Sequence, residues 1–129
     1  MLNNRDSNLR VVLFGLPRDI AENLGQMVSK WGSILYIPLL FPILRSLGLI
    51  REATPDMIFV WTGENPGMSL LALVRSAAPQ VPAVAVNLHA ENREILDALD
   101  SGAVDYCTPP FDTTHIQCLL QAANKAACC

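Results

Sequence analysis

The apolar and polar positions of this chain follow two alternating patterns. Short, nearly uninterrupted apolar runs are typical of strands that are buried on both faces of a parallel sheet. Five such runs occur, at residues 9–14, 34–37, 57–61, 83–88 and 103–107. Between and after them, apolar residues recur every three or four positions, as in helices with one buried face. These predicted helices lie around residues 20–31, 42–53, 70–74, 95–99 and 116–123.

Turn and cap residues support these boundaries. Gly32 follows the first predicted helix, Gly102 follows the fourth, and Asp112 is placed to cap the last. The helix within 42–53 has the least distinct start, which we expect between residues 41 and 45. Strands that alternate with helices, without an internal repeat, predict an α/β fold with a doubly wound parallel sheet.

The chain has 129 residues, of which 51% are hydrophobic, enough for the core of one domain. We place this domain at residues 9–125, after a flexible N-terminus at 1–8. Residues 126–129 are expected to be a tail or the start of a linker to an output domain.

Charge and hydropathy exclude several classes of function. The net charge is −3, and the nine basic residues are scattered singly, so we expect no direct binding of nucleic acid by this domain. The longest apolar stretch, 34–44, is interrupted by Pro38 and Pro42 and is too short to span a bilayer. Because the N-terminus is polar and lacks the order of a signal peptide, we expect a cytoplasmic protein without membrane contact.

The cysteines and histidines do not predict a metal centre. The four cysteines form no CxxC pair, and two of them are the last residues, Cys128 and Cys129. His115 and Cys118 share a helical face at a spacing suited to a metal, but two ligands are too few, and His89 would have to converge from another loop. We therefore expect these side chains to pack at the surface or in a groove, and we expect no metal and no cofactor.

Four segments resemble, in order and nearly in spacing, the receiver domain of bacterial response regulators. They are PDMIFVW at 55–61, PGMSLLALVR at 66–75, VPAVAVN at 81–87 and SGAVDYCTPPFD at 101–112. The resemblance extends over about residues 9–125 and is poor over 38–49. It implies a flavodoxin-like sheet with strand order 2-1-3-4-5.

The same resemblance implies that the phosphorylation chemistry of the family is missing. Gly15 and Leu16 stand where receivers carry two acidic Mg²⁺ ligands, and Trp61 stands where the phosphorylated aspartate would be. Asn87 replaces a hydroxyl residue, and Pro109 replaces the lysine that pairs with the phosphoryl group. Since phosphoryl transfer depends on positioning and charge neutralisation, we expect no aspartyl phosphorylation here. The five residues would line a filled or apolar remnant pocket.

Three acidic residues and one aromatic residue lie near the predicted site in the sequence. Asp19, Asp56 and Glu64 are the nearest acids in sequence, and Glu64 lies in the loop after the third strand; we expect all three to have structural roles. Tyr106 stands where receivers have an aromatic that moves on activation, and we favour fixed packing because the trigger is absent. Pro110 matches a proline that follows a cis peptide bond in the family.

The segment after the second strand is unusually apolar for a receiver. Leu39, Leu40 and Phe41 either form an exposed patch for self-association or a dedicated partner, or belong to an enlarged core. The sequence leaves both interpretations open.

These observations together predict a degenerate receiver, or pseudo-receiver, that is not an enzyme. It would act as an interaction module in bacterial signalling or transcriptional control, with a protein partner or as a homodimer, and with a possible C-terminal output domain. The alternative is a small-ligand-binding domain that uses Gly15, Trp61, Gly63 and Asn87 at the carboxyl ends of the strands. An active phosphoacceptor is the interpretation that the substitutions argue against most strongly.

Overall fold

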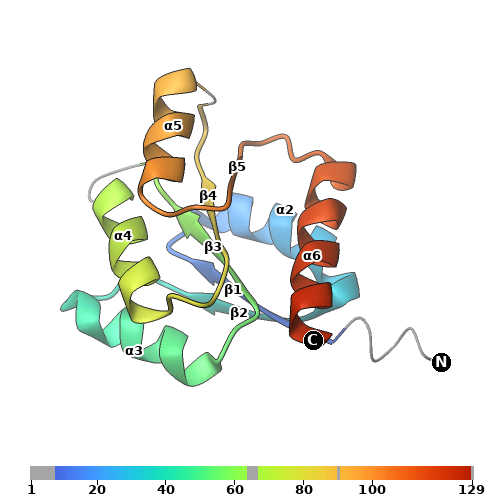
Figure 1. The fold of residues 1–129 in the computed structure, drawn as a ribbon, viewed down its shortest axis with the longest axis horizontal. Helices are drawn as coiled ribbons and strands as arrows, with labels where there is room; N and C mark the ends of the chain where they lie inside the picture. Colours follow the sequence, from blue (N-terminus) through green and yellow to red (C-terminus); the bar gives the residue numbers. More distant parts are fainter. Residues whose placement is uncertain (1–7, 64–66, 90, 129) are drawn as a thin grey trace.

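Five parallel strands form the central sheet of the computed structural model, which describes residues 8–63, 67–89 and 91–128 (Figure 1). Their order across the sheet is β2-β1-β3-β4-β5, and all four pairings are parallel. The strands are β1 Leu9–Phe14, β2 Gly32–Ile37, β3 Met57–Trp61, β4 Ala83–Val86 and β5 Asp105–Cys107. The predicted fold class and strand order are therefore confirmed.

Helices cover both faces of this sheet, as right-handed crossovers between parallel strands require. Two of them, α2 and α6, pack on one face, and α3, α4 and α5 pack on the other (Figure 1). Their bounds are α2 Arg18–Val28, α3 Ile43–Ala53, α4 Gly67–Ala77, α5 Asn92–Asp100 and α6 Thr113–Cys128. A short 3-10 helix, Ser29–Trp31, continues α2 as far as β2.

The core consists of two apolar layers separated by the sheet. Along β1, Leu13 packs toward α2 and α6, whereas Phe14 packs toward the opposite helices. Every side chain of β3 and β4 is buried, because both strands are central and both of their faces are covered. These layers account for the near-continuous apolar runs in the sequence.

The prediction that every strand is buried on both faces is wrong for β2. Leu35 and Tyr36 are 47% and 46% exposed. The reason is topological: within residues 8–63, 67–89 and 91–128, β2 lies at the edge of the sheet and pairs only with β1. The strand also begins at Gly32, two residues earlier than expected, where a Cβ would overlap the backbone of Leu9.

The predicted ends of the other elements are largely confirmed. Asp112 accepts a hydrogen bond from the Thr114 amide at 3.0 Å, as expected for a residue that caps α6. Helix α3 begins at Ile43, within the expected window. β4 ends two residues earlier than expected, and β5 begins two residues later, at Asp105. The predicted cis peptide bond before Pro110 is present.

The apolar segment after β2 is divided between core and surface, so each interpretation of it was right in part. Leu39 and Ile43 pack against the core, and Leu40 is partly buried, whereas Phe41 and Leu44 are 71% and 76% exposed.

A single buried serine holds this segment in place. The Ser46 hydroxyl donates a hydrogen bond to the Pro38 carbonyl at 2.9 Å and accepts one from the Leu40 amide at 2.8 Å. This tether connects the segment to α3 and satisfies two of its backbone groups.

The assigned domain limits are not tested by the fold. Residues 1–7 of the expected flexible N-terminus lie outside the described residues, and α6 continues to Cys128, within the segment assigned to a tail or linker. Within the described part of the chain, no helix is long and apolar enough to cross a membrane.

We predict that Ser46→Ala lowers the free energy of unfolding by about 0.5–1.5 kcal/mol, because it removes two part-buried hydrogen bonds. Urea denaturation measures this change. Ser76→Ala is the matched control, since Ser76 is an exposed helical serine, and we expect it to change stability by less than about 0.5 kcal/mol. Equal stability of the two variants would contradict the tether.

Candidate functional site

The candidate site lies at the carboxyl edge of the sheet, where parallel α/β proteins place their functional residues. Gly15 directly follows β1 in a left-handed backbone conformation, with φ of 73°, and its amide donates to the Ile37 carbonyl at 2.9 Å. A Cβ on Gly15 would lie 3.9 Å from the Cβ of Trp61. The ends of β1 and β3 therefore place these two predicted site residues side by side.

The indole of Trp61 fills the space beside the end of β3. Trp61 is only 8% exposed and belongs to the core layer on the α2 and α6 side. A Cβ on Gly63 would lie 2.8 Å from Cε2 of this indole and 3.1 Å from Oδ1 of Asn87. The ring consequently rests on the backbone of Gly63, next to the amide of Asn87, and the structure brings all three residues together.

The polar atoms around the ring are engaged elsewhere or lack a partner. Asn87 Oδ1 accepts a hydrogen bond from the amide of Leu88 at 2.6 Å. Nε1 of Trp61 is buried and has no hydrogen-bond partner among the residues that the structure describes, which leave out 64–66 of the adjoining loop. A buried N–H without a partner costs about 1–3 kcal/mol, which the apolar packing of the ring would have to offset.

Leu16 and Pro109 have roles other than contact with a pocket. The Leu16 side chain is buried in the same core layer as Trp61, and its carbonyl accepts a hydrogen bond from the Tyr36 hydroxyl at 2.6 Å. Pro109 lies on the loop after β5, where the neighbouring Thr108 hydroxyl donates to the Leu88 carbonyl at 3.2 Å. Neither side chain supplies a charge or an oxygen ligand at this edge.

Tyr106 is buried in the middle of β5, the edge strand next to β4. Its hydroxyl donates a hydrogen bond to the His89 carbonyl at 2.5 Å. Burial raises the pKa of this phenol, and the carboxylate of Glu94 raises it further. The neutral hydroxyl therefore remains a donor and holds the ring in the inward position.

Sequence reasoning missed three contacts of this region because they depend on how side chains are oriented in the fold. These are the packing of Trp61 on Gly63, the hydrogen bond of Tyr36 described above, and the pair of His115 Nε2 with Asp105 Oδ2 at 2.7 Å. The last pair links α6 to β5, with both side chains partly exposed.

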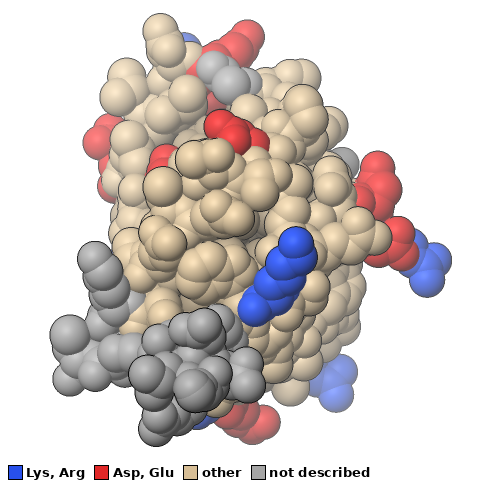
Figure 2. Space-filling model, turned by 90° about the vertical axis from the view of Figure 1, so that its right-hand side faces the viewer, with Lys and Arg blue, Asp and Glu red and all other residues tan. Residues whose placement is uncertain are grey.

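The acids and metal ligands near this edge can be located only in part. Glu64, the possible substitute acid, lies outside the described residues. Among those that the structure describes, no three histidine, cysteine or acidic side chains converge as a metal site would require. Figure 2 shows the face on which α6 lies, where the visible basic side chains stand apart from one another. On the visible part of this face, charge does not form a basic stripe of the kind that tracks nucleic acid.

Comparison with solved structures gives the class of the fold. The two-component response regulator of Clostridium difficile superposes with a TM-score of 0.76 at 21% identity, covering 93% of this chain and 98% of that one. A CheY-like protein (tadZ) from Pseudomonas aeruginosa superposes with a TM-score of 0.79 at 18% identity, and the match covers 90% of this chain and 99% of that one. The chain therefore has the fold of a response regulator receiver domain, and the resemblance indicated by its sequence is confirmed.

Two curated response regulators are also similar in sequence. Over 80 residues, 60% of this chain, it is 28% identical to the transcriptional regulatory protein KdpE of Staphylococcus aureus. Over 81 residues, 61% of the chain, it is 26% identical to the transcriptional regulatory protein ZraR of Escherichia coli. The matches span 34% and 18% of those longer proteins. No family model matches the chain.

The contact between Trp61 and Gly63 leads to a stability prediction. Gly63→Ala is expected to lower the free energy of unfolding by about 1–3 kcal/mol, because the new methyl group overlaps the indole. Gly48→Ala is the matched control: no atom lies within 4 Å of its new methyl group, and loss of a helical glycine should stabilise the fold by about 0.5–1 kcal/mol. Urea denaturation distinguishes the two; stabilisation by both variants would contradict the packing.

A second prediction concerns pH. Burial raises the pKa of the Cys107 thiol to about 12, and Asp105 adds to this effect. The thiol of the unfolded chain ionises near pH ~8.5. Because the folded protein keeps the thiol protonated to higher pH, the neutral thiol favours the folded state fully below pH ~8.5, and this stabilisation is lost as the pH rises toward 12.

Urea denaturation between pH 8 and pH 11 should show that the free energy of unfolding declines with pH. Ionisation of this thiol should account for up to ~1.4 kcal/mol of the decline per pH unit. Cys107→Ala lowers the overall stability but should flatten this decline. An unchanged slope in the variant would contradict the assignment to Cys107.

Proposed function

We propose that this chain is a degenerate receiver domain that works without phosphorylation, as a protein-interaction module in bacterial signalling or transcriptional control. The observation that carries the proposal is the buried indole of Trp61, which occupies the end of β3 where the receiver resemblance would place a phosphorylated aspartate. An indole has no oxygen that can attack phosphorus. The domain is accordingly not an enzyme.

The neighbouring residues support the same proposal on chemical grounds. Mg²⁺ requires oxygen ligands, but Gly15 has no side-chain oxygen, and the Leu16 side chain is buried hydrocarbon. Pro109 provides no cation to neutralise a phosphoryl group. Restoring one group alone would not restore the reaction, because catalysis of phosphoryl transfer depends on positioning and charge together.

The longer relatives suggest the setting in which this module acts. Both are named transcriptional regulatory proteins, and the present chain corresponds to about a third of one and less than a fifth of the other. We infer that a protein partner, and an output domain of the same polypeptide, respond to the state of this domain. Any contact with nucleic acid would then be made by the output domain, and the protein would act in the cytoplasm.

One observation favours a second candidate, a small-ligand-binding domain. Within the described part of the chain, Nε1 of Trp61 is a buried donor without a partner, and a bound carbonyl or anionic oxygen would satisfy it. Such binding would require the ring to leave Gly63, since the two are in close contact. Titration of Trp61 fluorescence with nucleotides and flavins, in a Trp31→Phe background, tests this candidate. If the fluorescence does not change, these compounds are not ligands of the site.

The proposal predicts that Mg²⁺ and beryllofluoride, a phosphoryl mimic, leave the amide NMR spectrum of the wild-type protein unchanged near Trp61. A receiver that retains its aspartate, measured in the same buffer, is the positive control. Trp61→Asp should also fail to bind the mimic, because Gly15 and Leu16 still lack metal-binding oxygens. Saturable shifts at the ends of β1 and β3 of the wild type would refute the proposal.

A further inference from the structure

The second strand, β2, is an unusually unprotected sheet edge. Its six residues, Gly32–Ile37, include no charged residue and no proline, and their register with β1 is continuous. Edge strands in natural proteins are generally protected by charge, proline, bulges or covering segments, since free backbone groups attract other strands. Leu35 and Tyr36, on opposite faces of β2, are about half exposed.

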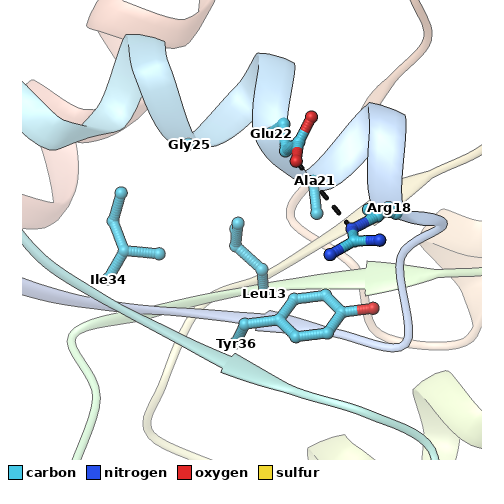
Figure 3. A pocket seen from close by; sticks show the side chains of 7 residues that line it. All are labelled: Leu13, Arg18, Ala21, Glu22, Gly25, Ile34 and Tyr36. Carbon is cyan, nitrogen blue, oxygen red and sulfur yellow. Dashed lines mark ion pairs between the residues drawn. The ribbon is translucent and has the colours of Figure 1, made fainter.

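An apolar groove follows this edge on the face covered by α2. It has a volume of about 460 Å³, and Figure 3 shows Ile34 and Tyr36 of β2 projecting into the space below α2. Its lining consists of Leu13, Arg18, Ala21, Glu22, Gly25, Ile34 and Tyr36. The Tyr36 hydroxyl is fixed by its bond to the Leu16 carbonyl, so the aromatic wall of the groove is preformed.

We infer that this edge is the interface between two copies of the chain, with β2 paired antiparallel to β2 of a second copy. A two-fold axis at Leu35 places this residue opposite its own equivalent. It also places Tyr36 opposite Ile34 of the second copy, and Ile34 opposite the second Tyr36. Aromatic side chains opposite β-branched ones are favourable cross-strand pairs. The two sheets would then continue across the interface.

The shape of the groove suits this arrangement. Residues 34 and 36 alternate with Leu35 along the strand, so in an antiparallel pair they lie on the same face as the groove. A Cβ on Gly25 would be 3.7 Å from Cδ1 of Ile34, an ordinary contact distance, so Ile34 already packs close to α2 at this point. The half-exposed Tyr36 of the second copy would pack on the outer side of Ile34, at the open edge of the groove.

The charges also fit an interface of identical copies. The facing strands are uncharged, so no like charges meet at their seam. At the rim of the groove, Arg18 and Glu22 form an exposed pair at 3.9 Å. A second copy contributes the same neutral pair, so these residues add no net charge to the interface. It also contributes an uncharged strand in which Ile34 and Tyr36 stand in the complementary order.

Sedimentation velocity over a range of protein concentrations tests the interface. The wild type should dimerise reversibly, and Tyr36→Lys should raise the dimer dissociation constant by about tenfold or more, because it places a cation in the seam. Leu96→Lys, which alters an exposed leucine of α5, is the matched control and should leave the dimer intact. Circular dichroism verifies that each variant is folded.

Disulfide trapping tests the register and does not depend on the effect of a lysine. In a background with Cys118, Cys128 and Cys129 changed to serine, Leu35→Cys should form a covalent dimer on mild oxidation. Directly opposed residues of an antiparallel pair have Cβ atoms about 4.5–5.5 Å apart, close enough for a disulfide after a small adjustment. Leu96→Cys in the same background should form no covalent dimer.

A wild type that stays monomeric at all concentrations would overturn the inference. So would a dimer that Leu96→Lys dissociates and Tyr36→Lys does not, because the interface would then lie on another face. The inference is independent of the proposed loss of phosphorylation, since β2 and its groove contain none of the residues that replace the phosphorylation site.

Discussion

The burial of the whole of β3 is the constraint on which the rest of the structure depends. All five of its side chains, from Met57 to Trp61, lie inside the molecule, and both core layers are built against them. A carboxylate at the end of such a strand requires a metal ion or a fixed cation nearby, because a buried unpaired charge is costly. An indole requires only apolar surroundings. The apolar side chains and the uncharged backbone around position 61 therefore suit a tryptophan better than a carboxylate.

Those neighbours form a packed carboxyl edge around the indole. Gly63 provides a flat backbone surface for the ring, and Leu16 extends the same core layer. Tyr106 is held inward through its bond to the His89 carbonyl. The described side chains of the carboxyl edge are thus held by packing and by hydrogen bonds, and on the proposed function any signal that the domain transmits would arise from binding at its surface. The open edge strand β2 offers one such surface.

Much of the fold could be predicted from sequence because it depends on local patterns. Buried central strands give continuous apolar runs, so β1 and β3 were located to the residue, and Asp112 marked the start of α6. The strand order came from the family resemblance. Exposure of the edge strand was missed, since Leu35 in an apolar run looks the same whether or not a neighbouring strand covers it.

The candidate site was predictable only in part. The resemblance identified which residues replace the usual chemistry, and Gly15, Trp61 and Asn87 do lie near one another. It did not indicate the fit of the indole onto Gly63, nor the tether from Ser46 that divides the apolar segment between core and surface. Such contacts depend on side-chain orientation, and periodicity carries no information about it.

Solvent exchange of the Trp61 indole proton tests the central claim most directly. If the ring is packed on Gly63 and closes the carboxyl edge, this proton should exchange as slowly as the backbone amides of β3, and Gly63→Ala should accelerate it. Exchange as fast as that of free tryptophan would show that the ring is open to solvent, and it would contradict the account of a filled phosphorylation site.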